Sequence, residues 1–312
     1  MDCKPKVVLS RCINKEPVRY NGGIVTDKFA EQLENYVEYI TVCPEVDVGM
    51  PVPRPTILLA KINDSIKVIE PNTKTDYTEK LEDFSKNFLN QLKEVDGFFL
   101  KAKSPSCGVM DAKLYKDDLK HSIGKTDGIF ASYAKKYFPH LPVEDEGRLN
   151  DYWIRRDFLT KIFAYADFRC LKNSAKSIKD LIKFHQRYKY LYMLYSPKNL
   201  KTMGNLIANW DKIGFEDTIK RYEELFKDTF SKHQTINRHI NVLQHIYGHF
   251  SDLLKPGERR HFSNLLQKMK EDRLYLKVTL EFIKNFIYRF EDEYLSSQKY
   301  LYPYPEDLEK IV

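Results

Sequence analysis

The stretch Lys6-Val7-Val8-Leu9-Ser10, with Arg11-Cys12 directly after it, decides the fold. A short run of branched apolar residues without polar alternation is typical of a strand buried on both faces, as in a parallel sheet covered by helices. Two similar runs follow, Tyr39-Ile40-Thr41-Val42 and Gly97-Phe98-Phe99-Leu100-Lys101. Apolar residues at helical spacing predict helices around these strands, over residues 27–36, 78–93 and 128–138. Strands that alternate with helices predict an α/β domain with a Rossmann-like parallel sheet over residues 1–148.

The second half of the chain has a different pattern. Glycine becomes rare, and apolar residues recur every three to four positions, which is the spacing of amphipathic helices. The segments with this spacing are residues 152–170, 177–195, 215–230, 235–254 and 275–294. The acidic run Glu144-Asp145-Glu146-Gly147 lies between the two patterns and marks the expected boundary. Residues 149–312 are therefore predicted to form a separate all-α domain.

Composition and charge limit the classes of function. The 312 residues are 42% hydrophobic and 13% aromatic, which suits two folded domains. No apolar stretch approaches the length of a membrane span and no signal peptide opens the chain, so a cytoplasmic location is expected. The net charge of +7 is uneven, about −1 before residue 151 and +8 after it. This excess predicts an anionic partner for the second half, and a solvated lysine-rich surface is the alternative.

Cysteines follow all three predicted strands. The five cysteines are too scattered for a disulfide framework, so reduced thiols are expected, and Cys3 and Cys170 are interpreted as non-ligands. Cys12, Cys43 and Cys107 each follow a strand, and loops after parallel strands meet at one edge of the sheet. Thiolates bind iron–sulfur clusters or zinc, but structural zinc prefers four ligands at paired spacings. Three thiolates suit a cubane iron–sulfur cluster in which the fourth iron stays open. The alternative is that the three cysteines are ordinary buried thiols, and their spacing alone does not decide between the two interpretations.

The residues around the cysteines form three motifs. They are Ser10-x-Cys12…Arg19-Tyr20-Asn21-Gly22, then Cys43-Pro44-Glu45…Gly49-x-Pro51-x-Pro53-Arg54, then Lys103-Ser104-Pro105-Ser106-Cys107-Gly108. Together they resemble the motifs of the DUF523 family, which includes the thiouracil desulfidases; Met50 stands where that family usually has leucine. The resemblance implies a 4Fe–4S cluster held by Cys12, Cys43 and Cys107, whose unique iron takes sulfur from a thiolated pyrimidine.

Two motifs in the second half resemble the DUF1722 family. They are Asn241-Val242-Leu243-Gln244-His245-Ile246-x-Gly248 and Gln298-x-Tyr300-Leu301-x-Pro303-Tyr304-Pro305. The fusion of the two domains is similar to desulfidases that convert 4-thiouridine in tRNA to uridine, which implies a hydrolytic reaction and a tRNA partner for the basic half. The alternatives are a desulfidase for free thiouracil or thiouridine, a non-catalytic metal-containing RNA-binding protein, and a redox sensor.

Polar residues beside the cysteines are the candidates for catalysis and substrate binding. Glu45, close to Cys43, is the expected proton acceptor, with Ser104 and Ser106 as orienting or relaying groups. The candidates for substrate binding are Arg19, Tyr20, Asn21, Arg54, Lys101 and Lys103. Six of these residues have a structural alternative: turn hydrogen bonds for Glu45 and the serines, a loop-anchoring ion pair for Arg54, and solvated side chains for the lysines.

Tyrosines mixed with cations offer an RNA-binding interpretation of the helical half. Tyr188, Tyr190, Tyr192 and Tyr195 could stack on splayed bases, but tyrosines at helical spacing belong to a core more often. Arg259-Arg260-His261 is a further candidate for contact with phosphates.

Overall fold

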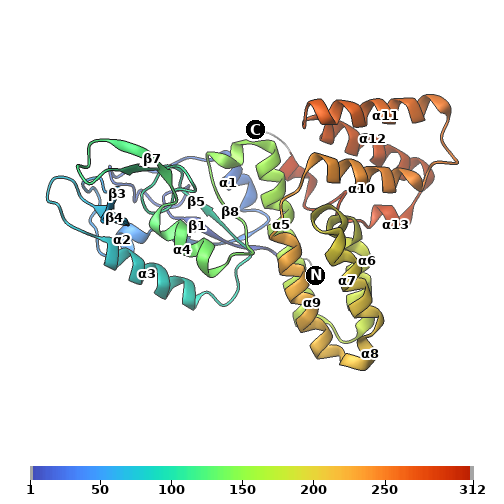
Figure 1. Cartoon of the computed structure of the whole chain (residues 1–312), viewed down its shortest axis with the longest axis horizontal. Helices are drawn as coiled ribbons and strands as arrows, with labels where there is room; N and C mark the ends of the chain where they lie inside the picture. The colour runs from blue at the N-terminus through green and yellow to red at the C-terminus, as the bar shows by residue number, and fades with distance from the viewer. Residues whose placement is uncertain (1–2, 310–312) are drawn as a thin grey trace. The chain divides into compact units, whose positions relative to one another are not determined.

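The computed structural model describes residues 3–309, which divide into two compact units (Figure 1). The first unit contains the chain up to Asp167 together with the tail from Asp307, and the second is Phe168–Glu306. Within the described residues, no helix is both long enough and apolar enough to cross a membrane. That residues 1–148 bind the cluster and residues 149–312 bind tRNA stays a prediction.

A four-stranded parallel sheet organises the first unit. Its order is β2-β1-β5-β8, and every neighbouring pair is parallel. The strands are β1 Lys6–Ser10, β2 Glu38–Val42, β5 Gly97–Leu100 and β8 Val143–Asp145. The predicted parallel sheet is confirmed, and its first three strands lie side by side. The acidic run predicted to mark the boundary contains the end of the edge strand β8.

Helices cover both faces of this sheet, which is why its strands are continuously apolar. Adjacent residues of a strand point to opposite faces. On one face Phe99 contacts Phe29 and Phe158, with ring centroids 5.9 and 6.3 Å apart; on the other, Phe98 lies 5.6 Å from Phe138. The helices of this unit are α1 Lys28–Leu33, α2 Pro44–Asp47, α3 Thr78–Gln91, α4 Ile129–Tyr137, the 3₁₀ turn Arg148–Asn150 and the first part of α5 Tyr152–Ser174.

A second four-stranded sheet, absent from the predictions, follows the cysteine loops. Its order is β4-β3-β6-β7. A turn at Asn63-Asp64, with both residues in the left-handed region, closes the β3–β4 hairpin, as two-residue hairpin turns require. One face packs on a core that includes Leu59, Leu81 and Ile129. The strands are β3 Leu58–Ile62, β4 Ser65–Ile69, β6 Ala112–Tyr115 and β7 Ser122–Thr126.

The second unit is entirely helical, as predicted. Aromatic rings fill its core: Phe168 stacks on Phe226 with centroids 4.5 Å apart, and Phe184 stacks on Tyr188 at 4.3 Å. Two helices that were not predicted, α7 and α11, begin with proline in the first turn, where its fixed φ fits. The helices are α6 Ile178–Tyr195, α7 Pro197–Ala208, α8 Trp210–Ile213, α9 Phe215–Phe230, α10 Ile236–Gly248, α11 Pro256–Glu271, α12 Tyr275–Phe290 and α13 Glu293–Ser296; the 3₁₀ turn Glu306–Glu309 follows.

Candidate active site

Three free cysteines converge on one cavity at the carboxyl edge of the parallel sheet. Cys12 follows β1, Cys43 follows β2 and Cys107 lies in the loop after β5, and these three strands are neighbours. Their side chains are buried and unoxidised. All three line a cavity of about 690 Å³. Within residues 3–309, no three His, Cys, Asp or Glu side chains form a group that could hold a single metal ion. The topology thus brings together thiols that are far apart in the sequence.

The three thiols influence one another electrostatically. Burial, and then the neighbouring Cys43, raises the pKa of Cys12 to about 12, while the charge of Lys101 opposes this shift. Burial also raises the pKa of Cys43, against the effect of the Val46 amide and the charge of Arg54. The pKa of Cys107 lies well above its usual value because of burial, and the Cys12 and Cys43 thiols add to the shift. Ionising all three therefore requires a strong positive charge next to them.

Short polar contacts hold the cysteine loops in place. Asp47 accepts the Cys43 backbone N–H at 3.1 Å and forms an ion pair with Arg11 at 2.9 Å, so one carboxylate joins the first two loops. In the third loop, the Ser104 hydroxyl accepts the N–H groups of Ser106 and Cys107 at 3.2 and 3.1 Å. The turn hydrogen bonds considered for Ser104 are therefore present.

The start of α4 packs directly against the third cysteine loop. A Cβ atom on Gly128 would lie 2.5 Å from the Ser106 carbonyl carbon and 2.7 Å from the Cys107 nitrogen. Neither atom can move without shifting the backbone of the loop. Glycine at residue 128 therefore lets α4 support the loop that carries Cys107.

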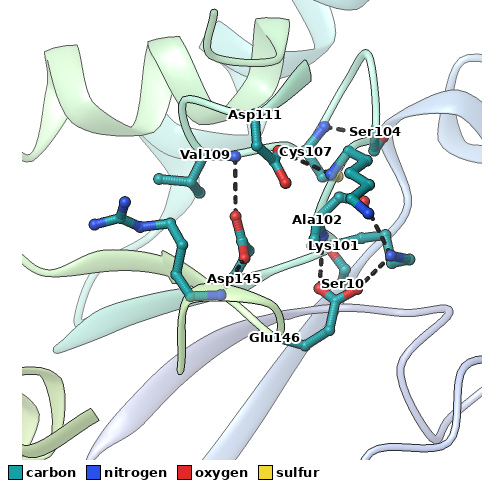
Figure 2. A network of polar contacts seen from close by, with 11 residues as sticks. Ser10, Lys101, Ala102, Ser104, Cys107, Val109, Asp111, Asp145 and Glu146 are labelled. Carbon is teal, nitrogen blue, oxygen red and sulfur yellow. Dashed lines mark hydrogen bonds and ion pairs between the residues drawn. The ribbon is translucent and has the colours of Figure 1, made fainter. Parts of the chain in front are cut away.

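A partly buried polar network lies beside Cys107 (Figure 2). The Lys101 ammonium forms an ion pair with Glu146, and Glu146 also accepts the Ala102 backbone N–H. The Lys101 backbone N–H donates to the Ser10 hydroxyl at 2.9 Å, and the Ser10 hydroxyl lowers the pKa of the Cys107 thiol against the larger effect of burial. Lys101 is thus held next to the thiols, rather than solvated as its structural alternative supposed.

Two further carboxylates complete the network (Figure 2). Asp145 is fully buried and accepts the N–H groups of Arg148 and Val109 at 2.8 and 3.4 Å. Burial, followed by the nearby charges of Asp111 and Glu146, raises the pKa of Asp145 to about 6. Asp111 accepts the Lys103 backbone N–H at 2.8 Å, with Lys103 in the left-handed region at φ 59°. The end of β8 therefore supports the third cysteine loop.

Glu45 lies at the centre of a second polar group. Its Oε2 accepts from Arg54 Nε at 2.8 Å, and its Oε1 accepts from the Ser106 hydroxyl at 3.0 Å. The side chains of Glu45 and Arg54 are 12% and 3% exposed. Arg54 also donates to the Val18 carbonyl at 3.1 Å. The ion pair considered for Arg54 is present, and its partner is the predicted proton acceptor.

The predicted site residues divide into those that line the cavity and those that support it. Ser106 and Asn21 do not line it: Ser106 orients Glu45, and the Asn21 side chain accepts the Gly23 N–H in a turn. The predicted residues that line the cavity are Cys12, Arg19, Tyr20, Cys43, Glu45, Arg54, Lys101, Lys103, Ser104 and Cys107.

Sequence reasoning missed the contribution of the second sheet. Lys113 and Tyr115 of β6 and Lys125 of β7 line the cavity. It also missed Asp47, Asp145 and Glu146 as supports of the cysteine loops. The available signal was a carboxylate beside a strand end or in a cysteine loop. Asp145 and Glu146 carry this signal, but the run Glu144-Asp145-Glu146 was interpreted as a domain boundary.

The helical unit contains no exposed tyrosine platform of the kind considered. Tyr188, Tyr190, Tyr192 and Tyr195 are each at most 1% exposed, so the core interpretation is confirmed. The expectation of reduced thiols is wrong for Cys3 and Cys170, which are disulfide-bonded, and holds for the three cysteines of the cavity.

Comparisons with known proteins find similarities for both parts of the chain. Residues 7–146 match the family model of 2-thiouracil desulfurase, and residues 189–305 match that of DUF1722, a family of unknown function. A curated relative, the uncharacterised protein YbgA of Escherichia coli (strain K12), is 25% identical over 150 residues, which is 47% of this chain and 88% of YbgA. A solved structure, the [4Fe-4S]-dependent thiouracil desulfidase TudS, is 24% identical with a TM-score of 0.38, over 47% of this chain and 93% of that one. The first part of the chain is thus similar to 2-thiouracil desulfurases, enzymes that act on a carbon–sulfur bond, and the second part is similar to DUF1722 domains.

Proposed function

We propose that the chain removes sulfur from 4-thiouridine in tRNA, leaving uridine and sulfide, with a 4Fe–4S cluster held by Cys12, Cys43 and Cys107. The observation that carries this proposal is the convergence of three buried, free thiols on one cavity inside a desulfurase domain. The solved desulfidase named above depends on a 4Fe–4S cluster, which agrees with this choice of cofactor.

The chemistry of these donors fits an iron–sulfur cluster. Thiolates are the ligands that hold such clusters, and a structural zinc ion would take a fourth ligand. Cluster binding would release the thiol protons whose pKa values burial has raised, and Lys101 would offset part of the resulting negative charge. The bound cluster would supply an iron site for the thiocarbonyl sulfur. The chain's own residues must then handle water and protons.

Glu45 is positioned to accept a proton from the attacking water. The water oxygen bonds to C4 of the pyrimidine, the carbon–sulfur bond breaks, and the two water protons leave with the sulfur as hydrogen sulfide. This exchange is hydrolytic and needs no electron donor. Arg54 and Ser106 hold the two oxygens of Glu45, so the carboxylate is oriented before substrate arrives. Ser106 is thus a positioning residue, and Ser104, which lines the cavity, can donate its hydroxyl proton to the substrate.

Arg19 and Tyr20 are the proposed contacts for the base and ribose. Both line the cavity, Tyr20 is 44% exposed, and the Arg19 guanidinium lies 5.7 Å from the centre of the Tyr20 ring. A planar guanidinium and an aromatic ring suit the edge and the face of a pyrimidine. Asn21 would shape this loop through its hydrogen bond with the Gly23 N–H, and Lys103 would contribute positive charge at the cavity.

The second unit is proposed to bind the tRNA backbone. The excess positive charge of the chain lies after residue 150, and Arg259, Arg260 and His261 are exposed near the start of α11. Phosphate contacts of nucleic-acid-binding proteins come mainly from Lys and Arg. Since the tyrosines of α6 are in the core, this binding rests on charge rather than on stacking.

The test is anaerobic reconstitution followed by incubation with tRNA that contains 4-thiouridine. Loss of thiocarbonyl absorbance with release of sulfide is expected for the wild-type chain, and neither for Cys107→Ser. A fully loaded cluster with intact thiouridine would overturn the proposal. Zinc at full occupancy without iron would support a non-catalytic RNA-binding protein, and an oxygen-sensitive cluster without sulfide release would support a redox sensor.

A charge variant separates tRNA from the free base as substrate. Arg259→Gln/Arg260→Gln is expected to slow desulfuration of tRNA while leaving that of free thiouracil unchanged. Lys201→Gln/Lys212→Gln removes the same charge from exposed helical residues of the same unit and is the matched control. Equal rates on tRNA for both variants would favour a free thiolated base or nucleoside as the substrate.

A further inference from the structure

Ser10, the last residue of β1, is a buried polar residue at the cavity of the three cysteines. It lines that cavity and is only 1% exposed. Its backbone is fixed, because β1 pairs with β2 on one side and with β5 on the other, and the Ser10 carbonyl accepts the Ile13 N–H at 2.8 Å. The hydroxyl is therefore held at the end of an internal strand of the sheet.

The hydrogen bonds of this hydroxyl are only partly accounted for within the protein. Its oxygen accepts the Lys101 backbone N–H at 2.9 Å (Figure 2). A serine hydroxyl also has one proton to donate. Among residues 3–309, no oxygen or nitrogen atom accepts that proton. Since buried polar groups rarely lack a partner, the proton is available to another kind of acceptor at the cavity.

The sulfur of Cys107 is the acceptor that the electrostatics favour. Burial raises the pKa of the Cys107 thiol, and the Ser10 hydroxyl acts in the opposite direction. A neutral hydroxyl lowers the pKa of a thiol when it donates its proton to the ionised sulfur. For Cys12, the group that opposes burial is the charge of Lys101. The two thiols are thus stabilised in their ionised forms by different neighbours, and Ser10 is the neighbour of Cys107.

We propose that Ser10 donates a hydrogen bond to the sulfur of Cys107 when this thiolate holds the cluster, which slows the loss of the cluster and raises its reduction potential. Hydrogen bonds to the sulfurs help to set the potential of an iron–sulfur cluster, because they stabilise the added negative charge of the reduced state. Ser10 acts through Cys107 and is therefore a positioning residue. This role rests on the proposed function only in the three cysteines as cluster ligands, and it depends on neither the substrate nor the reaction.

The test compares Ser10→Ala with the wild-type chain, both reconstituted anaerobically and without substrate. We expect the midpoint potential of the cluster in Ser10→Ala to move to a more negative value. The rate at which a strong chelator removes iron should rise about tenfold or more, because a hydrogen bond to a charged group is lost. In the resonance Raman spectrum, a stretching band of the iron–cysteine bonds should move to higher frequency.

A matched control accounts for the Lys101 N–H, which loses its acceptor in Ser10→Ala. The Thr78 hydroxyl also accepts a buried backbone N–H, that of Val68 at 2.9 Å, and Thr78 does not line the cavity. Thr78→Val removes this acceptor with little change of side-chain shape. It should leave the potential, the iron release and the Raman band unchanged. Thermal unfolding measures the loss of stability in both variants.

The outcomes separate the role of Ser10 from the proposed function. Unchanged potential and iron release in Ser10→Ala would overturn this role, and so would equal changes in Thr78→Val. Changes in Ser10→Ala alone would support it, even if the wild-type chain released no sulfide from thiolated substrates, which would contradict the proposed function. Uptake of zinc in place of the cluster would also contradict that function. Faster release of zinc from Ser10→Ala would then still support the hydrogen bond to Cys107, and equal release would overturn it.

Discussion

The hydroxyl of Ser106 donates a 3.0 Å hydrogen bond to Oε1 of Glu45, 61 positions earlier in the chain. This bond joins the third cysteine loop to the second, and it leaves the carboxylate facing the cavity that the cysteines line. The position of Glu45 therefore depends on Ser106, which does not itself line the cavity.

Replacement of Glu45 tests its role as proton acceptor. We expect Glu45→Gln to lower kcat about 10²-fold or more, which is the usual contribution of a general base, with iron content unchanged. The measurement is the initial rate of sulfide release at equal iron loading. Ser106→Ala should lower kcat less and shift the pH profile of the rate, because it only orients the carboxylate. If Glu45→Gln kept the wild-type kcat, another group would have to accept the proton of the attacking water.

Arg54 is expected to be needed for folding as well as for the site. Arg54→Gln leaves the buried Glu45 carboxylate without its cation, which costs about 3–5 kcal/mol in the free energy of unfolding. Denaturant titration measures the loss. Lys61→Gln breaks the exposed pair with Asp64 and should cost about 1 kcal/mol or less. Similar losses of unfolding free energy for the two variants would mean that the buried pair stabilises the fold no more than the exposed pair does.

Gly128→Ala should disrupt the third cysteine loop. Its Cβ would overlap backbone atoms of Ser106 and Cys107, so we expect loss of most of the bound iron after reconstitution. Gly257→Ala is the control, because its Cβ would meet no atom within 4 Å. Full iron content in Gly128→Ala would show that the loop can shift without losing its function.

Asp145 should make the chain less stable as the pH rises from about 4 to 6. Its pKa of about 6 in the fold exceeds the usual value near 4, so the folded state favours the protonated form. The resulting stability is present at low pH and is lost as the pH rises through 6. We expect the free energy of unfolding of Asp145→Asn, relative to wild type, to rise by up to about 3 kcal/mol between pH 4 and pH 7. A constant difference across this range would contradict the shifted pKa.

The sequence predicted the parallel sheet well because its strands are buried on both faces and carry no polar alternation. The meeting of Cys12, Cys43 and Cys107 followed from that topology, since each comes after one of three neighbouring strands. The second sheet was missed because a lysine interrupts the apolar run in each of its strands, and β7, Ser122–Thr126, is largely exposed. Their strand pairing depends on tertiary contacts that local propensity does not contain.

The edge strand β8 shows a different limit. Carboxylates are rarely buried without partners, so Glu144-Asp145-Glu146 gave the pattern of a solvated linker. Asp145 is buried because backbone N–H groups of Arg148 and Val109 satisfy it, and Glu146 because Lys101 does. These partners come close to the carboxylates only in the folded chain, so they cannot be predicted from the acidic run alone.

The return of the chain's tail to the first unit has a consequence for biosynthesis. Asp307 accepts a hydrogen bond from Tyr36, and Glu309 forms an ion pair with the buried Arg156, so residues that follow the helical unit in sequence complete this first unit. A ribosome delivers these last contacts only after it has made the whole helical unit. A nascent or prematurely terminated chain would contain all three cysteines yet lack this closing contact. Insertion of iron and sulfur into a fully formed first unit would therefore be a post-translational event.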